Sequence, residues 1–129
     1  MHRKFIATGI FFGAIGVAFG AFGAHGLKKI VAAETVQTFQ TGVQYQMYHA
    51  LALILTGILF EKFSQRFTVL AGKLFIAGIF LFSGSLYVLT AGKAAELTAF
   101  DKAGIITPFG GVCFIAGWLF LFFAVLKSK

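Results

Sequence analysis

Acidic residues are scarce in this sequence: Asp and Glu together occur 4 times in 129 residues, and charged residues make up only 12%. Soluble domains carry about 25% charged residues, so the composition argues against a soluble globular domain. No carboxylate falls inside the long apolar stretches, so neither Asp nor Glu is available there for acid–base chemistry. Cysteine is also nearly absent. The single Cys113 cannot form an intrachain disulfide, and no metal-ligand spacing, Cys-x-x-Cys or phosphate-binding glycine loop occurs.

Basic residues are more frequent, but they form no patch. The net charge is +7, which would suit nucleic acid, yet the Lys and Arg residues lie at the ends of apolar stretches, as topology signals do. We therefore expect no nucleic-acid partner. The N-terminal residues His2-Arg3-Lys4, followed by an apolar run, resemble the basic region of a cleaved signal peptide. The run is longer than a usual signal-peptide core, so we expect it to be retained as a membrane span.

What the sequence has in abundance is long apolar runs. Hydrophobic residues make up 59%, and four windows contain no Asp, Glu, Lys or Arg: 5–27, 35–60, 74–92 and 103–126. Each supplies the roughly 20 residues that cross about 30 Å of hydrocarbon. The sequence predicts an all-α integral membrane protein. Its single domain, residues 1–129, would be a compact bundle of four transmembrane helices with spans at about 5–25, 43–63, 69–91 and 107–127.

The polar stretch between the first two spans has helical periodicity. Val36, Phe39, Val43 and Met47 recur on one side. This predicts a short amphipathic interfacial segment that continues into span two; the alternative is a long helical start of that span. The aliphatic part of span two, 50–60, is too short to cross alone, so residues 45–49 are expected at or just inside one interface.

Proline occurs once, at the start of the last span. Pro108 is expected in the first helical turn, where its missing N–H has no cost. The alternative is that it kinks a helix that began near residue 103.

Glycine is frequent and regularly spaced. Five glycines of span one follow one another at intervals of four, three, four and three residues, within roughly an 80° arc of one helix face. Span four carries a second small-residue stripe. Since small residues let helices approach closely in lipid, we expect helix packing at these glycines: Gly9, Gly13, Gly16, Gly20, Gly23, Gly110 and Gly117. The opposite, alanine-rich face of span one ends in His25 and is expected to face polar groups of the bundle.

The basic residues also predict an orientation. With the N-terminus inside, seven basic residues lie inside and four outside, which favours both termini in the cytoplasm and insertion in the cell (inner or plasma) membrane. The inside group is Arg3, Lys4, Lys62, Arg66, Lys73, Lys127 and Lys129, and the outside group is Lys28, Lys29, Lys93 and Lys102.

In that orientation, polar side chains gather in the outer half of the bundle. Polar faces in lipid turn inward, because an unpaired polar group in hydrocarbon is costly. The members of this predicted polar cluster are His25, Tyr45, Gln46, His49, Ser83, Tyr87 and Thr107. Each also has a simpler interpretation: the histidines as helix caps, the tyrosines as an aromatic belt, and the serine as a small packing residue.

Four motifs resemble a known family. They are residues 20–26 (GAFGAHG), 43–53 (VQYQMYHALAL), 82–87 (FSGSLY) and 106–111 (ITPFGG). Together they resemble the YgdD/YwdK-like family of small bacterial inner-membrane proteins of unknown function, which has a short eukaryotic transmembrane relative. The resemblance implies a compact multi-pass membrane protein and carries over no catalytic residue.

Two functions follow from these observations. The first is a non-enzymatic protein that acts by packing with lipid, with a second copy or with another membrane protein. The alternative is transport or binding of a small solute, ion or proton through the predicted polar cluster. We expect no enzyme activity, because the sequence has no nucleophile signature, and no cofactor or metal.

Overall fold

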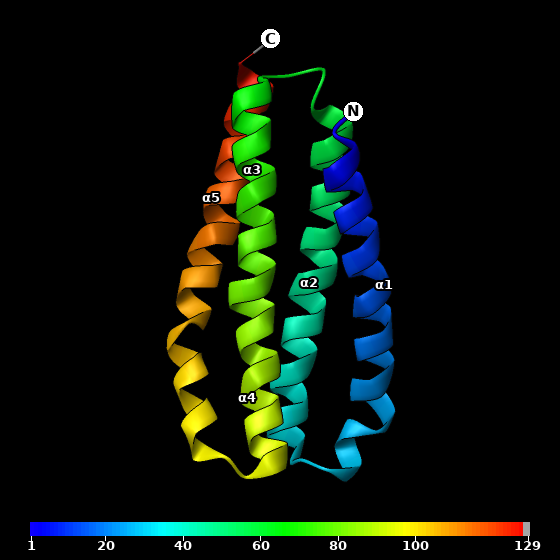
Figure 1. Ribbon diagram of the computed structural model, residues 1–129, viewed down its shortest axis with the longest axis vertical. Helices are drawn as coiled ribbons and strands as arrows, with labels where there is room; N and C mark the ends of the chain where they lie inside the picture. The colour runs from blue at the N-terminus through cyan, green and yellow to red at the C-terminus, as the bar shows by residue number, and fades with distance from the viewer. Residues whose placement is uncertain (128–129) are drawn as a thin grey trace.

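The computed structural model describes residues 1–127; Lys129, counted above among the inside charges, lies outside the described residues. Within them every regular element is helical, which confirms the all-α expectation, and four antiparallel rods are formed (Figure 1). The first two rods are α1 (Arg3–His25), followed by the short 3₁₀ helix η1 (Leu27–Lys29), and α2 (Ala33–Leu59).

The third rod combines three elements without a break. These are α3 (Gln65–Gly78), the π-helix η2 (Ile79–Ser83) and α4 (Gly84–Ala95). A 3₁₀ helix, η3 (Thr98–Ile105), leads into α5 (Thr107–Leu126). Pro108 lies in the first turn of α5 and does not kink a longer helix.

The start of α1 and the end of α5 lie at one end of the molecule (Figure 1). The N-terminal ammonium group forms an ion pair with Glu61, just beyond α2. The backbone N–H of Ser64, at the start of α3, donates to the carbonyl of Lys127 at 3.2 Å. The two termini and the α2–α3 connection are therefore tied together.

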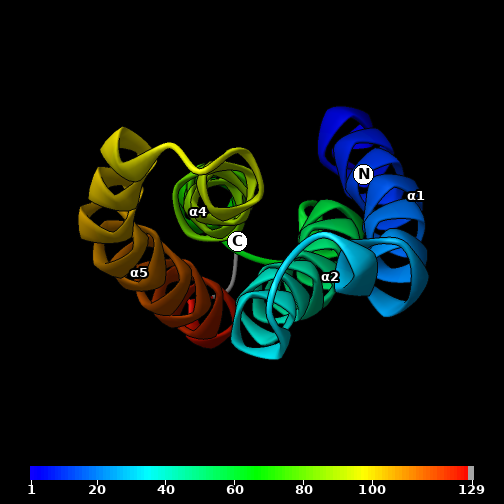
Figure 2. The ribbon, with the colours of Figure 1, turned by 90° about the horizontal axis from the view of Figure 1, so that it is seen from below.

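The rods lie in an open row, with α1 and α5 at opposite edges and α2 and the α3–α4 rod between them (Figure 2). This differs from the expectation that the alanine-rich face of α1 faces polar groups of the bundle. Its glycine face lies toward α2, where Gly9, Gly16 and Gly23 are buried, whereas Ala14 and Ala18 on the opposite face are exposed. Only the glycine face allows the close backbone approach that holds α1, so the alanine face is left outside.

Close approach at the glycines is visible in the geometry. A Cβ atom added to Gly9 would lie 2.7 Å from the carbonyl oxygen of Ala50 on α2, and one added to Gly110 would lie 2.6 Å from the carbonyl carbon of Leu81 on η2. Real Cβ atoms essentially never come this close to backbone. By contrast, a Cβ atom at Gly13 would meet nothing within 4 Å.

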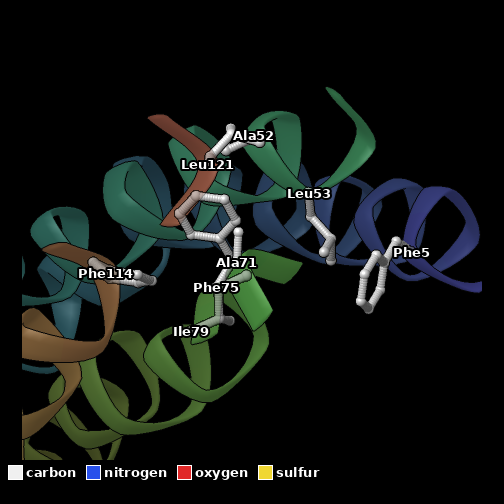
Figure 3. Packing of buried hydrophobic residues seen from close by; sticks show 8 residues of the cluster. All are labelled: Phe5, Ala52, Leu53, Ala71, Phe75, Ile79, Phe114 and Leu121. Atoms are coloured by element: carbon white, nitrogen blue, oxygen red, sulfur yellow. The ribbon is translucent and has the colours of Figure 1, made fainter. Parts of the chain in front are cut away.

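The apolar core sits where α2, α3 and α5 meet (Figure 3). Phe75 of α3 is fully buried at its centre, between residues of α2 and α5. The other members shown are Phe5, Ala52, Leu53, Ala71, Ile79, Phe114 and Leu121. The core joins the two helix hairpins into one unit.

Three helical stretches are long and apolar enough to cross a membrane: Arg3–Lys29, Gln65–Ala95 and Thr98–Leu126. Although α2 has 27 residues, it is not among them. Its centre carries Gln44, Gln46 and His49, which lower its hydropathy.

Candidate functional site

Gln46 joins three helices near the middle of the molecule. From α2, its Nε2 donates to the carbonyl oxygen of Phe12 in α1 at 2.8 Å. Its Oε1 accepts from the hydroxyl of Tyr87 in α4 at 2.6 Å. The amide is buried, so both bonds form away from water and fix the positions of the two neighbouring helices against α2.

Ser83 makes a second link, from the end of the π-helix to α2. Its hydroxyl donates to the carbonyl oxygen of Gly42 at 2.6 Å, and its side chain is fully buried. Gly42 itself is closely packed: a Cβ atom there would lie 3.0 Å from the Tyr87 ring. The extra residue of a π turn shifts the side chains that follow it, and η2 ends at the serine that bonds to α2.

His49 is enclosed by aromatic rings. Its imidazole stacks on Phe114 with ring centroids 3.5 Å apart. Its Nδ1 lies 2.7 Å from the carbonyl oxygen of Tyr45, and its Nε2 accepts from the indole N–H of Trp118 at 3.0 Å. A carbonyl can only accept and an indole can only donate. The ring is therefore neutral, with its proton on Nδ1, and neither nitrogen is available as a base or metal ligand.

The remaining predicted residues lie apart from this centre. The hydroxyl of Thr107, at the start of α5, lies 2.5 Å from that of Ser85 in α4. His25 is exposed at the end of α1, and its Nδ1 lies 3.0 Å from the carbonyl oxygen of Ala21 in its own helix. Within residues 1–127 its side chain shares no hydrogen bond or ring contact with the other six members of the predicted polar cluster.

The segment 45–49 does not lie at an end of its helix. Because α2 begins at Ala33 and ends at Leu59, the segment occupies the centre of a rod about 40 Å long. Gln46 accordingly meets Phe12, which lies near the centre of α1. Residues 33–42 are therefore not a separate element but the first turns of α2, as in the second of the two interpretations of this stretch. The position of residues 45–49 relative to a membrane interface stays a prediction.

An aromatic groove opens between α2 and α5 at this height. Its volume is about 510 Å³, within the range of small-molecule pockets. Phe82 of η2 and Gly111 of α5 lie beside it, and the His49–Phe114 stack forms part of its wall. The groove is completed by Tyr45, Tyr48, Ile115 and Trp118.

The sequence interpretation missed Trp118. It is the only tryptophan in the chain, and it lies eleven residues after Thr107, the first residue of α5, rather than at an end of the helix where an aromatic belt would be expected. The indole N–H of a tryptophan inside a span needs a hydrogen-bond acceptor. This requirement is a signal from which a Trp118–histidine pair could have been predicted.

Few side chains suited to catalysis or metal binding are brought together. Residues 1–127 contain no group of three or more His, Cys, Asp or Glu side chains that could hold a metal ion. The acidic residues are all exposed and lie at the ends of the rods: Glu34, Glu61, Glu96 and Asp101. His49 therefore has no carboxylate partner.

Comparison with known proteins agrees with this picture of an apolar helical protein. The family described as "Protein of unknown function (DUF423)" matches residues 19–111. The UPF0382 membrane protein YwdK of Bacillus subtilis is 44% identical, over 97% of this chain and 98% of its own. A UPF0382 membrane protein of Haemophilus influenzae is 36% identical, over 100% of this chain and 98% of its own.

The UPF0382 inner membrane protein YgdD of Escherichia coli is 37% identical, over 91% of this chain and 85% of its own. No solved structure matches the chain. The matches confirm the resemblance seen in the four motifs. The chain belongs to the DUF423 family, whose relatives named here are UPF0382 membrane proteins and whose function is unknown.

Proposed function

We propose that this protein is a non-enzymatic inner-membrane bundle that acts by packing against lipid, a second copy or another membrane protein. The observation that carries this proposal is the closed hydrogen bonding of the interior. Within residues 1–127 no buried side-chain nitrogen or oxygen lacks a hydrogen-bond partner. Buried polar groups that are all hydrogen-bonded stabilise a fold, so each of them has a structural role in this interior.

The outer surface supports the same proposal. Large apolar side chains are exposed along the edge helices, such as Phe11 and Val17 of α1 and Phe122 of α5. In water this much exposed apolar surface would cause aggregation, whereas in a bilayer it is the ordinary lipid-facing surface. We further propose that the glycine faces of α1 and α5 are the internal packing seams and that the edge helices meet lipid or a partner.

All four rods cross the membrane in this proposal, with both termini in the cytoplasm. Two features support it: the termini lie at the same end (Figure 1), and Arg3, Lys62, Arg66 and Lys127 lie at that end, where the positive-inside rule places them. The rod α2 is longer than the hydrocarbon layer. Its first turns, 33–42, would then extend into the headgroup region as the amphipathic segment.

Cysteine labelling tests the topology. In a Cys113→Ala background, Lys62→Cys should be protected from an impermeant maleimide added outside intact cells, and Lys28→Cys should react. The reverse pattern would invert the orientation. Labelling of both sites would contradict a four-span topology.

Native mass spectrometry from lipid nanodiscs tests the packing function. We expect the protein to leave the membrane with bound lipid, a second copy or a partner protein. A strict monomer that carries none of these would contradict the proposal.

Transport through polar groups is a weaker hypothesis on this geometry. Both ring nitrogens of His49 are engaged in hydrogen bonds. Within the described residues, His25 shares no hydrogen bond or ring contact with His49, and its Nδ1 is paired with a carbonyl oxygen of its own helix. Flux of a small ion or solute into liposomes that depends on His49 would revive it. Flux that survives both His25→Ala and His49→Ala would exclude a histidine-based path.

A further inference from the structure

The groove between α2 and α5 has a composition that selects for a neutral ligand. Its lining contains no Lys, Arg, Asp or Glu. His49, the one titratable nitrogen base in the wall, is held neutral by its two hydrogen bonds. A charged headgroup placed there would be far from water and without a counter-ion, which is costly.

The lining also favours a flat ring over a flexible chain. Tyr45 packs on Phe82 with centroids 4.7 Å apart, and Phe114 and Trp118 supply further aromatic surface across the groove. Aromatic faces and edges bind planar rings by stacked and edge-to-face contacts. Gly111 opens the space between them, since a Cβ atom there would have only Phe82 within about 4 Å, at 4.0 Å.

Two phenol groups supply hydrogen-bond donors that the protein does not use. The hydroxyl of Tyr45 makes no hydrogen bond within residues 1–127, although it lines the groove at the centre of α2. The hydroxyl of Tyr48 accepts from Nε2 of Gln44 at 2.6 Å and keeps its own proton to donate. In hydrocarbon an unpaired hydroxyl is costly, so an acceptor brought by a ligand would be favoured.

We propose that this groove binds the ring of a membrane-soluble carbonyl compound of the quinone class. The Tyr45 hydroxyl donates to one ring carbonyl, Tyr48 supplies a second donor, and the ring lies against Phe82 and Trp118. The apolar tail of such a compound extends along the lipid-facing side of α5. This inference rests on the proposed membrane placement of α2 and α5.

Trp118 makes the proposal directly testable, because it is the only tryptophan and lines the groove. The full-length protein is placed in nanodiscs and titrated with decylubiquinone, a benzoquinone with a ten-carbon tail. We expect saturable quenching of Trp118 fluorescence. Phenyldecane, which has a ring and tail but no carbonyl, should give no saturable component.

Two variants test the site against a matched control. Tyr45→Phe removes one hydrogen bond and should weaken quinone binding about three- to tenfold. Gly111→Leu should fill the groove and abolish the saturable quenching. Gly13→Leu makes the same change on α1 at a position with no neighbour within 4 Å and should bind as the wild type does. Circular dichroism checks that each variant is folded.

Phospholipid with brominated acyl chains separates the possible failures. If brominated lipid quenches Trp118 but decylubiquinone quenches only in linear, non-saturable fashion, the groove holds acyl chains and the quinone proposal is overturned while membrane placement stands. If brominated lipid does not reach Trp118, the bilayer does not reach the groove, and the quinone proposal fails. The labelling of Lys28→Cys and Lys62→Cys then decides separately whether the proposed membrane placement stands. Equal quinone affinity in the wild type and Tyr45→Phe would also overturn the assigned donor.

Discussion

Replacing Gln46 by leucine should show how much of the fold depends on one buried amide. The side chain accepts from Tyr87 in α4 and donates to the backbone of Phe12 in α1. Gln46→Leu keeps the approximate volume and removes both interhelical bonds. It also leaves the Tyr87 hydroxyl without its partner in apolar surroundings, because the rings of Phe19 and Phe39 both pack against the Tyr87 ring.

The magnitude follows from these losses. Interhelical hydrogen bonds in membrane proteins average about 0.6 kcal/mol, and a buried hydroxyl left unsatisfied costs about 1–3 kcal/mol. We expect Gln46→Leu to lower the free energy of unfolding by about 2 kcal/mol and Tyr87→Phe by about 1.5 kcal/mol. The double variant loses both bonds but leaves no orphaned hydroxyl, so it should lose only about 1 kcal/mol.

Unfolding by SDS in mixed lipid micelles, followed by far-ultraviolet circular dichroism, measures these free energies. Gln44→Leu is the matched control, because Gln44 lies on the same helix with an exposed side chain and should change stability by less than about 0.5 kcal/mol. If the effects of Gln46→Leu and Tyr87→Phe add to within about 0.5 kcal/mol, the two side chains are not coupled. That result would refute the three-helix junction.

Three further substitutions test individual contacts by the same unfolding assay. Gly110→Ala should cost about 1–3 kcal/mol by forcing α5 away from the π-helix, whereas Gly111→Ala, beside it, should be close to neutral; equal effects would argue against the close approach. Gly9→Ala should destabilise the α1–α2 contact, while Gly13→Ala should be neutral or stabilising by up to about 1 kcal/mol. If only Gly13→Ala lowered the stability, the assignment of Gly9 to the face that packs on α2 would be contradicted. Trp118→Phe removes the donor to the buried imidazole and should cost about 1–3 kcal/mol; an unchanged midpoint would show that this hydrogen bond contributes nothing.

Several features of this protein followed from the sequence by itself. Helical secondary structure follows from long runs without charge, since hydrocarbon-length apolar segments must satisfy their backbone internally. Pro108 predicted the start of the last helix, because its missing N–H has no cost in a first turn, and the structure removed the alternative of a kinked helix from residue 103. The family resemblance followed from four short motifs, because they recur in the same order along the chain.

The residues at the middle of the bundle could not be predicted, because they are set by contacts between distant parts of the chain. Periodicity could not tell whether residues 33–42 are a separate segment or part of α2, because both alternatives have the same helical spacing. In the structure these residues belong to one continuous helix that packs along α1 and α4, so Gln46 and His49 lie near its centre. Partners such as Trp118 are 69 residues away in the chain, and no local pattern reports such a distance. The π turn that ends at Ser83 likewise makes close contacts with both neighbouring helices, through Gly42 of α2 and Gly110 of α5. Local residue patterns thus determined the helices, whereas long-range packing decided which helices are neighbours and which polar groups bond across them.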